Sequence, residues 1–460
     1  MLQKPNDIID RRREWNSLWR LAESPRGELA FVVGRRRVGK SFVLARFTTA
    51  VGGIYYQATR RTEREQLLSL SRLLGDHFAD SALMHGDGFS SWEGVLAYVT
   101  EKAPPLLVID EFPYLVETTP SLPSLLQSFW DHQWKEGGLK IVLSGSYISA
   151  MERLEAVDQP LYGRRTARII FPPFSPQDAA QFVPDYTPRD RLTAWSTFGN
   201  LPGNLSLLDP DRSIGENIGD QILNPSGRLV DDAQHLLDPF VSEGGVYYSI
   251  LEAIASGEET WKGITRRVGR SGGALSRPLE WLESMGLIRR VVPITEKNPA
   301  KSKRTLYRIA DPYLLFWHSQ VAPLLRAGSI GQVSPERLWQ SVIAPRLDNH
   351  MGAHFEEACR EFVRNSEKLP FLPVRTGEWW NVTSDAQVDV VAIGADGELL
   401  VGEVKWGPVR SSHVLTLSER AKMIAAELGG ITTTHLALFT GREPSVPPGA
   451  PLIFTLTDIV

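Results

Sequence analysis

The residues best suited to chemistry near the start of the chain form a glycine-rich, basic segment that fits the pattern GxxxxGK[ST] at every fixed position. The segment consists of Gly34, Arg35, Arg36, Arg37, Val38, Gly39, Lys40 and Ser41. A short apolar run, 29–33, precedes it, and a stretch with helical patterning, 40–50, follows. Such a strand, loop and helix point backbone N–H groups at phosphates, with the lysine on the β- and γ-phosphates and the serine on Mg²⁺. The pattern therefore predicts a binding site for ATP and Mg²⁺.

Two acidic residues follow a second apolar run, 106–109. After a buried strand of this kind, Asp110 is in position to hold Mg²⁺, and Glu111 is in position to polarise the attacking water. An acidic pair at the end of a strand is common on protein surfaces, but the phosphate-binding segment upstream favours the catalytic interpretation. We therefore expect nucleotide and metal to bind at Asp110, and hydrolysis to depend on Glu111.

Polar residues also follow a third apolar run, 139–143. Ser144 or Ser146 is placed to contact the γ-phosphate from a neighbouring strand, with Ser144 as the nucleotide-binding candidate, although Ser-Gly-Ser also favours an ordinary turn. Further on, Arg164 is a candidate for stabilising the charge that develops on the γ-phosphate in the transition state. It is equally compatible with a basic pair on the surface, formed with Arg165.

Near the C-terminus, carboxylates are embedded in apolar runs. Glu403 and Lys405 are two residues apart, so they share one face of a strand. If 394–398 form a turn, Asp389 lies opposite Glu403 on the neighbouring strand. Two carboxylates beside a lysine predict a site for Mg²⁺ or Mn²⁺ that would activate water for attack on a phosphodiester. The alternative is a strand with charged residues that face solvent.

A basic segment, 261–308, stands apart from the rest of the chain. It holds twelve lysines and arginines against three acids, about +9, while the remaining residues carry about −13 to give the net charge of −4. Three short helical patterns and two strand-like runs within 246–310 are typical of a winged helix-turn-helix. The charge predicts contact with double-stranded DNA, through Arg270, Arg277, Lys301, Lys303 and Arg304. The alternative is a module that packs on the rest of the protein as a lid or an oligomer contact.

The composition indicates a globular protein of several domains, with 460 residues, 42% of them hydrophobic, and one cysteine. A single cysteine rules out an intrachain disulfide and a CxxC metal site. The first residues lack the apolar core of a signal peptide, and no stretch approaches the roughly 20 apolar residues of a membrane span. We therefore expect a soluble, cytoplasmic protein without a membrane partner. His318, His350 and His354 have no metal-binding spacing and are predicted to be structural.

Five segments, in this order, resemble the archaeal-type ATPase family, a branch of the STAND/AAA-like P-loop ATPases. They are IIDRRREW, GRRRVGKS, LLVIDEF, LSGSYISAM and LYGRRTARIIFPPFSP, and the resemblance covers about residues 8–240. It implies ATP hydrolysis, with Ile8, Ile9 and Arg11 near the adenine. We also regard an ATP-dependent homo-oligomer as a candidate assembly.

The spacing D…ExK resembles the PD-(D/E)XK nuclease superfamily. More closely, GAHFEEACREFV, GEWWN, QVDVVAI and VGEVKW resemble the domain that commonly follows archaeal-type ATPase modules, over about residues 335–440. The match implies that Glu356 joins Asp389 and Glu403 at the metal from a helix, with Gln387 as an accessory residue. A nuclease fold whose activity is lost or tightly gated is the alternative.

Together these patterns predict an α/β protein: a P-loop NTPase parallel sheet with a helical lid, a winged helix-turn-helix, and a C-terminal α/β restriction-endonuclease-like domain. The expected domains are 1–170, 171–240, 241–328 and 329–460. The predicted function is an ATP-dependent switch coupled to a DNA-associated, nuclease-like domain. The alternative is an ATP-switched regulator that binds DNA or protein and carries an inactive nuclease fold.

Overall fold

The computed structural model describes residues 2–146, 148–237, 245–270, 272–407, 411–442 and 451–460. The chain divides into two compact units, an N-terminal unit of Met1–Pro173 and a C-terminal unit of Phe174–Val460. The division into four domains expected from the sequence stays a prediction. None of the described helices combines the length and the apolarity needed to cross a membrane.

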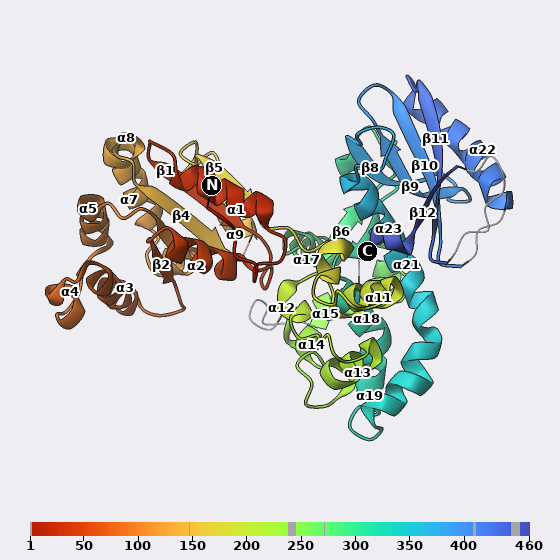
Figure 1. Cartoon of the computed structure of the whole chain (residues 1–460), viewed down its shortest axis with the longest axis horizontal. Coiled ribbons are helices and arrows are strands. Elements are labelled where there is room, and N and C mark those ends of the chain that lie inside the picture. Colours follow the sequence, from red (N-terminus) through yellow and green to blue (C-terminus); the bar gives the residue numbers. More distant parts are fainter. Residues whose placement is uncertain (1, 147, 238–244, 271, 408–410, 443–450) are drawn as a thin grey trace. The chain divides into compact units, whose positions relative to one another are not determined.

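The N-terminal unit is built on a parallel sheet of five strands (Figure 1). In spatial order these are β2 Ile54–Gln57, β3 Leu107–Asp110, β4 Lys140–Gly145, β1 Glu28–Val33 and β5 Ala167–Ile170. Because β4 lies between β1 and β3, the residues that follow these three strands gather at one edge of the sheet. The predicted α/β class and the parallel sheet are therefore confirmed.

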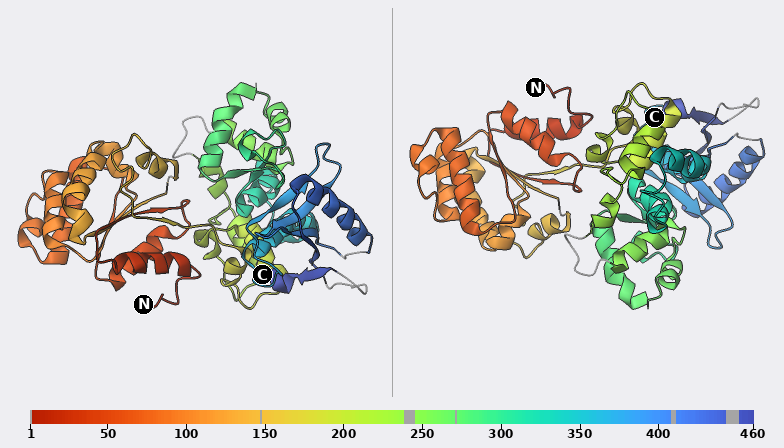
Figure 2. Two further views of the ribbon diagram at one scale, coloured as in Figure 1. Left: turned by 90° about the horizontal axis from the view of Figure 1, so that it is seen from above. Right: turned by 90° about the horizontal axis from the view of Figure 1, so that it is seen from below.

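Helices cover both faces of this sheet. Those of the N-terminal unit are α1 Arg12–Ala22, α2 Lys40–Ala50, α3 Glu63–Phe78, α4 Ser81–His85, α5 Trp92–Lys102, α6 Pro113–Thr118, α7 Leu122–Phe129, the π-helix η1 Trp130–Trp134, α8 Lys135–Gly137 and α9 Ile148–Leu154. Figure 2 shows α1 and α2, in red, on one face and the orange helices of the following segment on the other. This is the layering expected for strands that are buried on both sides.

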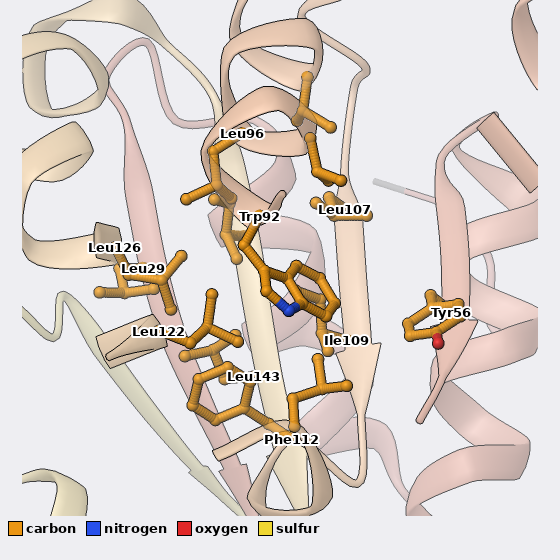
Figure 3. Packing of buried hydrophobic residues seen from close by; sticks show 14 of the residues in the cluster. Leu29, Tyr56, Trp92, Leu96, Leu107, Ile109, Phe112, Leu122, Leu126 and Leu143 are labelled. Atoms are coloured by element: carbon orange, nitrogen blue, oxygen red, sulfur yellow. The ribbon is translucent and has the colours of Figure 1, made fainter. Parts of the chain in front are cut away.

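The core of the N-terminal unit explains why the sequences of its central strands are unbroken apolar runs. Leu29 and Phe31 of β1 belong to the cluster that packs around Trp92 of α5 (Figure 3), whereas Ala30 and Val32 are equally buried but lie outside this cluster. Alternate residues of one strand thus serve both faces of the sheet. Trp92 is 2% exposed, so replacing it with alanine would cost about 3–5 kcal/mol.

The C-terminal unit begins with a group of helices. A module of three helices and a β-hairpin follows. The helices are α10 Pro176–Ala180, α11 Pro188–Phe198, α12 Pro202–Leu205, α13 Ile214–Ile218, η2 Gly219–Leu223 and α14 Asp232–His235. The module consists of α15 Gly245–Ala255, α16 Trp261–Val268, α17 Gly272–Ser284 and the antiparallel pair β6 Ile288–Val291 and β7 Leu306–Ile309. The three helices and two strands expected in this region are present, with Pro278 inside α17.

A mixed sheet of five strands completes the C-terminal unit. In spatial order these are β12 Leu452–Thr455, β11 Thr433–Thr440, β10 Glu398–Lys405, β9 Gln387–Ile393 and β8 Arg375–Trp380. The helices of this part are α18 Pro312–Phe316, η4 Trp317–Val321, α19 Ala322–Arg326, α20 Pro335–Leu338, α21 Leu347–Asn365, α22 Ser411–Leu428 and α23 Leu456–Ile459. Two long helices, α21 and α22, pack on the sheet and supply side chains near its charged residues.

Candidate functional site

The phosphate-binding segment turns sharply between the end of β1 and the start of α2. Gly39 has a φ of 93°, a conformation that residues with side chains rarely adopt. A Cβ atom at Gly34 would come within 2.7 Å of the carbonyl oxygen of Phe171. Both glycines of the motif are therefore required by the backbone, and the turn they permit leads directly into the N-terminus of α2, where phosphates bind.

The Lys40 side chain folds back over this segment. Its Nζ donates to the carbonyl oxygens of Gly34 at 2.7 Å and Arg35 at 3.1 Å, and to Ser146 Oγ at 3.2 Å. Lys40 is only 4% exposed, and burial lowers its pKa to about 8. A buried ammonium group whose hydrogen-bond acceptors are neutral oxygens is a strong partner for a phosphate anion, so the segment fits a triphosphate.

Near Ser41 and Asp110, the predicted Mg²⁺-binding residues, lies a tyrosine that no sequence motif marks, Tyr55. Asp110 is fully buried, and its Oδ2 accepts a hydrogen bond from the Tyr55 hydroxyl at 2.6 Å. Ser41 lies close enough to the same hydroxyl to influence its pKa. Hydroxyl and carboxylate oxygens are the ligands that Mg²⁺ prefers, so the residues present fit this ion. The glycine pair before IYYQ was the only sequence signal for the strand that carries Tyr55.

Glu111 meets Ser146 at the same edge of the sheet. Its carboxylate accepts hydrogen bonds from the Ser146 hydroxyl and, at 3.3 Å, from the Ser146 backbone N–H. Because Ser146 Oγ also lies 3.2 Å from Lys40 Nζ, one serine links the predicted water-polarising acid to the phosphate-binding lysine. Ser144, in contrast, is fully buried, and its Oγ has no hydrogen-bond partner in the described part of the chain. Of the two serines, Ser146 is the one that the fold brings to the site.

Arg164 lies at the opposite end of the sheet from the phosphate-binding segment. It precedes β5, which runs parallel to β1 and starts with Ala167 beside Ala30, whereas the phosphate-binding segment follows the end of β1. The Arg164 guanidinium donates to both carboxylate oxygens of Asp131, at 2.9 and 2.7 Å. Arg164 is therefore a surface residue paired with an acid, and the prediction that it binds the nucleotide of its own chain is corrected.

The C-terminal carboxylates lie on adjacent strands in the predicted register. β9 and β10 are antiparallel with Val390 opposite Gly402, so the next step along the strands places Asp389 opposite Glu403. The Asp389 Oδ2 atom accepts a hydrogen bond from the Val404 backbone N–H at 3.0 Å. The spacing of the sequence motif thus does translate into neighbouring positions on the sheet.

These carboxylates do not assemble into a metal site. Burial, and then the charge of Asp389, raise the pKa of Glu356 on α21 to about 7, which places the two groups within electrostatic reach. However, the Glu403 carboxylate contacts Lys405 Nζ at 2.5 Å and Arg420 at 3.4 Å. Across all residues described, no group of three or more His, Cys, Asp or Glu side chains is arranged to hold a metal ion. The Mg²⁺ or Mn²⁺ site predicted at Glu356, Asp389 and Glu403 is therefore not formed in this structure.

The basic segment is less cationic in the folded protein than its sequence indicates. Arg289 of β6 contacts Glu357 of α21 at 2.5 Å. Arg308 of β7 contacts Glu378 of β8 at 2.6 Å, and the two side chains are 21% and 9% exposed. Both acids lie outside the segment in sequence, so the charge of +9 counted along the chain overstates the charge at the surface.

The residues predicted to contact DNA divide into two groups. Arg304 donates to the carbonyl oxygen of Trp380 at 3.1 Å and to the Glu296 carboxylate at 3.4 Å, so its guanidinium is already bound within the protein. The other four are exposed and form no ion pair with any described residue; they are Arg270, Arg277, Lys301 and Lys303. Only these four retain the surface position that a phosphate contact requires.

The comparison with protein families identifies the domain that carries the phosphate-binding segment. Residues 8–208 match the family described as an ATPase domain predominantly from Archaea. This part of the chain is a P-loop ATPase domain. Residues 317–417 match a second family, DUF234, described as archaeal and bacterial proteins of unknown function. The matched residues include Lys40, the acids at the end of β3 and directly after it, and the serines within β4 and directly after it.

Two further proteins resemble the chain over most of their lengths. The protein MJECL04 of Methanocaldococcus jannaschii is 27% identical over 412 residues, which are 88% of this chain and 89% of the relative. The Walker-type ATPase PABY2304 of Pyrococcus abyssi superimposes with a TM-score of 0.52 and 22% identity, covering 68% of this chain and 97% of that protein. At 22% identity, the similarity to the Pyrococcus abyssi protein concerns the fold alone. This shared fold is consistent with the family match to an ATPase domain.

Within the ATPase domain, Arg11 contacts the phosphate-binding segment directly. Its guanidinium, from a residue 2% exposed, donates to the carbonyl oxygen of Val38 at 3.0 Å and lies 5.4 Å from the centroid of the Phe171 ring. Ile8 is also buried, and Ile9 is half-buried. The segment expected near the adenine therefore contacts and stabilises the loop that would bind the phosphates. Its contact with adenine stays a prediction.

Proposed function

We propose that this protein hydrolyses ATP to ADP and phosphate at the ATPase domain, with Mg²⁺. The observation that carries the proposal is the meeting of Lys40, Ser146 and Glu111 at one edge of the sheet. Hydrolysis needs a cation on the γ-phosphate and a carboxylate near the attacking water, and both must lie close to the same phosphorus. The hydrogen bonds through Ser146 bring these two groups together.

Each residue has a distinct role in this proposal. Lys40 neutralises charge on the β- and γ-phosphates, and Ser41 and Asp110 hold Mg²⁺, which would neutralise developing charge on the phosphate oxygens. Glu111 orients the water. It has a φ of 53°, a left-handed conformation that costs a residue with a side chain about 1–2 kcal/mol. Strain of this kind is retained where the direction of a side chain matters, which supports a functional role for Glu111.

The test is ATP hydrolysis by the full chain and two variants. Lys40→Ala should lose both ATP binding and hydrolysis, because the phosphates lose their buried cation. Glu111→Gln should keep ATP affinity within about threefold and lose about 100-fold or more in hydrolysis, because only the reaction of water is affected. Lys102→Ala and Glu117→Gln, which change exposed residues of the same domain, are the matched controls. Unchanged binding and hydrolysis in Lys40→Ala would refute the proposal.

For the C-terminal unit we propose a winged helix that contacts double-stranded DNA and whose position depends on the bound nucleotide. The four exposed cations Arg270, Arg277, Lys301 and Lys303 support the DNA contact. A nucleotide shifts such an equilibrium only if it binds two conformations with different affinity. DNA affinity measured with ADP, with a non-hydrolysable ATP analogue and without nucleotide should therefore differ; equal affinities would reject the switch.

The second candidate function is a metal-dependent nuclease at the C-terminal sheet, supported by the register that sets Asp389 opposite Glu403. An active site would need Lys405 and Arg420 to leave Glu403 when a metal arrives. Mn²⁺ should then raise the melting temperature of the C-terminal unit, and Asp389→Ala should abolish both this shift and any plasmid nicking. If Mn²⁺ has no effect, the regulator with an inactive nuclease fold is the better description.

A further inference from the structure

One hydroxyl group contacts a side chain that would hold Mg²⁺ in the ATPase domain and lies near a second. Tyr55 lies on β2, the edge strand next to β3, and its hydroxyl donates to Asp110 Oδ2 at 2.6 Å. Ser41, the first residue after Lys40 in α2, lies close enough to this hydroxyl to influence its pKa. Ser41 and Asp110 come from different elements and are 69 positions apart in the sequence. A side chain from a third element therefore holds one of them, Asp110, and lies near the other.

The Asp110 carboxylate is held at both oxygens. While Oδ2 accepts from Tyr55, Oδ1 accepts from the backbone N–H of Glu111 at 3.0 Å. A carboxylate offers about four lone-pair directions, so two donors leave positions for a water bound to Mg²⁺. The tyrosine can therefore stay in place when the ion binds, and its effect is to orient the carboxylate.

The next residue along β2 provides a contrast. Tyr56 points to the other side of the strand, where its hydroxyl donates to Gln66 Oε1 at 2.6 Å. Tyr56 is 4% exposed and belongs to the hydrophobic core, so it has a structural role away from the phosphate-binding segment. Two adjacent tyrosines of the same strand thus serve different parts of the domain, as the alternation of side chains along a strand requires.

We propose that Tyr55 is a positioning residue for Mg²⁺, which holds the Asp110 carboxylate in the orientation the ion needs before the ion binds. The inference rests on the proposed function, because it presumes that Mg²⁺ and nucleotide bind at this site. In this proposal Tyr55 is not itself a ligand of the ion; it acts through Asp110, whose carboxylate accepts its hydrogen bond. Preorganising ligands in this way increases affinity by reducing the ordering that binding would otherwise require.

The surroundings of Tyr55 suit a permanent donor. Burial, followed by the charge of Asp110 and the hydrogen bond to it, raises the pKa of Tyr55 above its ordinary value. The direction of this shift agrees with the geometry, in which the hydroxyl keeps its proton and donates it to Asp110.

The experiment compares Tyr55→Phe with Tyr56→Phe in the full chain, since each change removes one hydroxyl from β2. Mn²⁺ serves as the spectroscopic probe for Mg²⁺: the dissociation constant of Mn²⁺ in the presence of saturating ADP is measured by electron paramagnetic resonance. Affinity for a fluorescent ADP analogue is measured separately in EDTA. Because a hydrogen bond to a charged group is lost, Tyr55→Phe should raise the Mn²⁺ dissociation constant about tenfold. The affinity for the ADP analogue in EDTA should stay within twofold.

Tyr56→Phe should leave the Mn²⁺ dissociation constant unchanged, although it lowers the melting temperature. A Tyr55→Phe variant that binds Mn²⁺ as tightly as the natural chain would overturn the inference. So would an equal loss of metal and of nucleotide affinity, because it would indicate a general disturbance of the domain. If the natural chain binds neither Mn²⁺ nor the ADP analogue, the proposed function itself fails, and the positioning role fails with it.

Discussion

At the scale of single residues, Ser144 within β4 and Ser146 directly after it show how a shift of two positions separates a buried residue from one at the candidate site. Ser146 contacts Lys40 and Glu111, whereas the Ser144 hydroxyl is buried without a partner among the residues described. A buried hydroxyl without a hydrogen bond contributes nothing favourable, so its removal is tolerated. The two serines therefore make a matched pair for testing the site.

We predict that Ser146→Ala lowers the rate of ATP hydrolysis about 10- to 100-fold, because Glu111 loses the group that connects it to Lys40. Ser144→Ala should leave the rate within about threefold and leave the free energy of unfolding equal or slightly higher. Steady-state hydrolysis with saturating ATP and a chemical denaturation curve for each variant provide the measurements. If Ser144→Ala lowers the rate more than Ser146→Ala does, then Ser144, as the sequence predicts, is the residue that contacts the γ-phosphate.

His318 and His354 give a second prediction at this scale, which concerns pH. Both are buried, and neither Nε2 atom has a hydrogen-bond partner within the described ranges. Burial lowers the pKa of His318 to about 4 from its ordinary value of 6.5, and burial also lowers the pKa of His354. Between pH 6.5 and pH 4, His318 binds a proton in the unfolded chain but not in the folded chain. The free energy of unfolding therefore falls as the pH falls.

The contribution of His318 is complete above pH 6.5 and declines by about 3 kcal/mol by pH 4. His318→Gln should therefore reduce the dependence of the C-terminal unit's melting temperature on pH between 6.5 and 4. His235→Gln, a change at an exposed histidine of the same unit, should not. Equal pH dependence in the natural chain and in His318→Gln would show that His318 is not the titrating group.

At the scale of elements, the β6–β7 hairpin joins the basic module to the C-terminal sheet. Arg308 binds Glu378, and Arg289 binds Glu357, so cationic residues on both strands are paired with acids of α21 and β8. The backbone N–H of Ile294 also donates to the Glu378 carbonyl oxygen at 2.9 Å. The hairpin therefore stabilises the C-terminal unit on one side and leaves only part of its charge for an external partner.

This division predicts opposite results for two sets of substitutions. Arg308→Ala should lower the free energy of unfolding of the C-terminal unit by about 3 kcal/mol, because it leaves Glu378 buried without its cation. Lys301→Ala combined with Lys303→Ala should leave stability unchanged, weaken binding to double-stranded DNA at any sequence, and reduce the salt dependence of binding by about one unit per lost phosphate contact. DNA affinity that is insensitive to the double substitution would favour the alternative that the module contacts protein.

At the scale of the whole molecule, the division at Pro173 places the nucleotide site and the C-terminal sheet in separate units. Calorimetry should therefore resolve two transitions that respond to different conditions. ATP with Mg²⁺ at 100 times its dissociation constant should stabilise the N-terminal unit by about 2.7 kcal/mol, which raises its melting temperature by about 5–10 °C. The second transition should respond to pH through His318 and not to ATP. A single transition that shifts as a whole would show that the units unfold together.

The sequence by itself determined the interior of both sheets but none of their edges. The three inner strands of the parallel sheet, β1, β3 and β4, were predicted as apolar runs, and the sequence at 386–393, 399–406 and 434–440 likewise predicts the inner strands β9, β10 and β11 of the mixed sheet. The strands that were not predicted, β2, β5, β8 and β12, are the edge strands of the two sheets. An inner strand is buried on both faces and must be apolar throughout, whereas an edge strand is short and keeps polar side chains.

The same contrast holds for the site. The phosphate-binding segment and the acids after β3 could be predicted because each depends on a few consecutive residues, whose backbone turn requires particular residue types. Tyr55 beside Asp110, Ser146 in place of Ser144, and Arg164 at the far end of the sheet follow from strand order and direction. The net charge of the basic module likewise depended on acids from other elements. Contacts between distant segments are set by tertiary packing, because a motif fixes only the side chains within it.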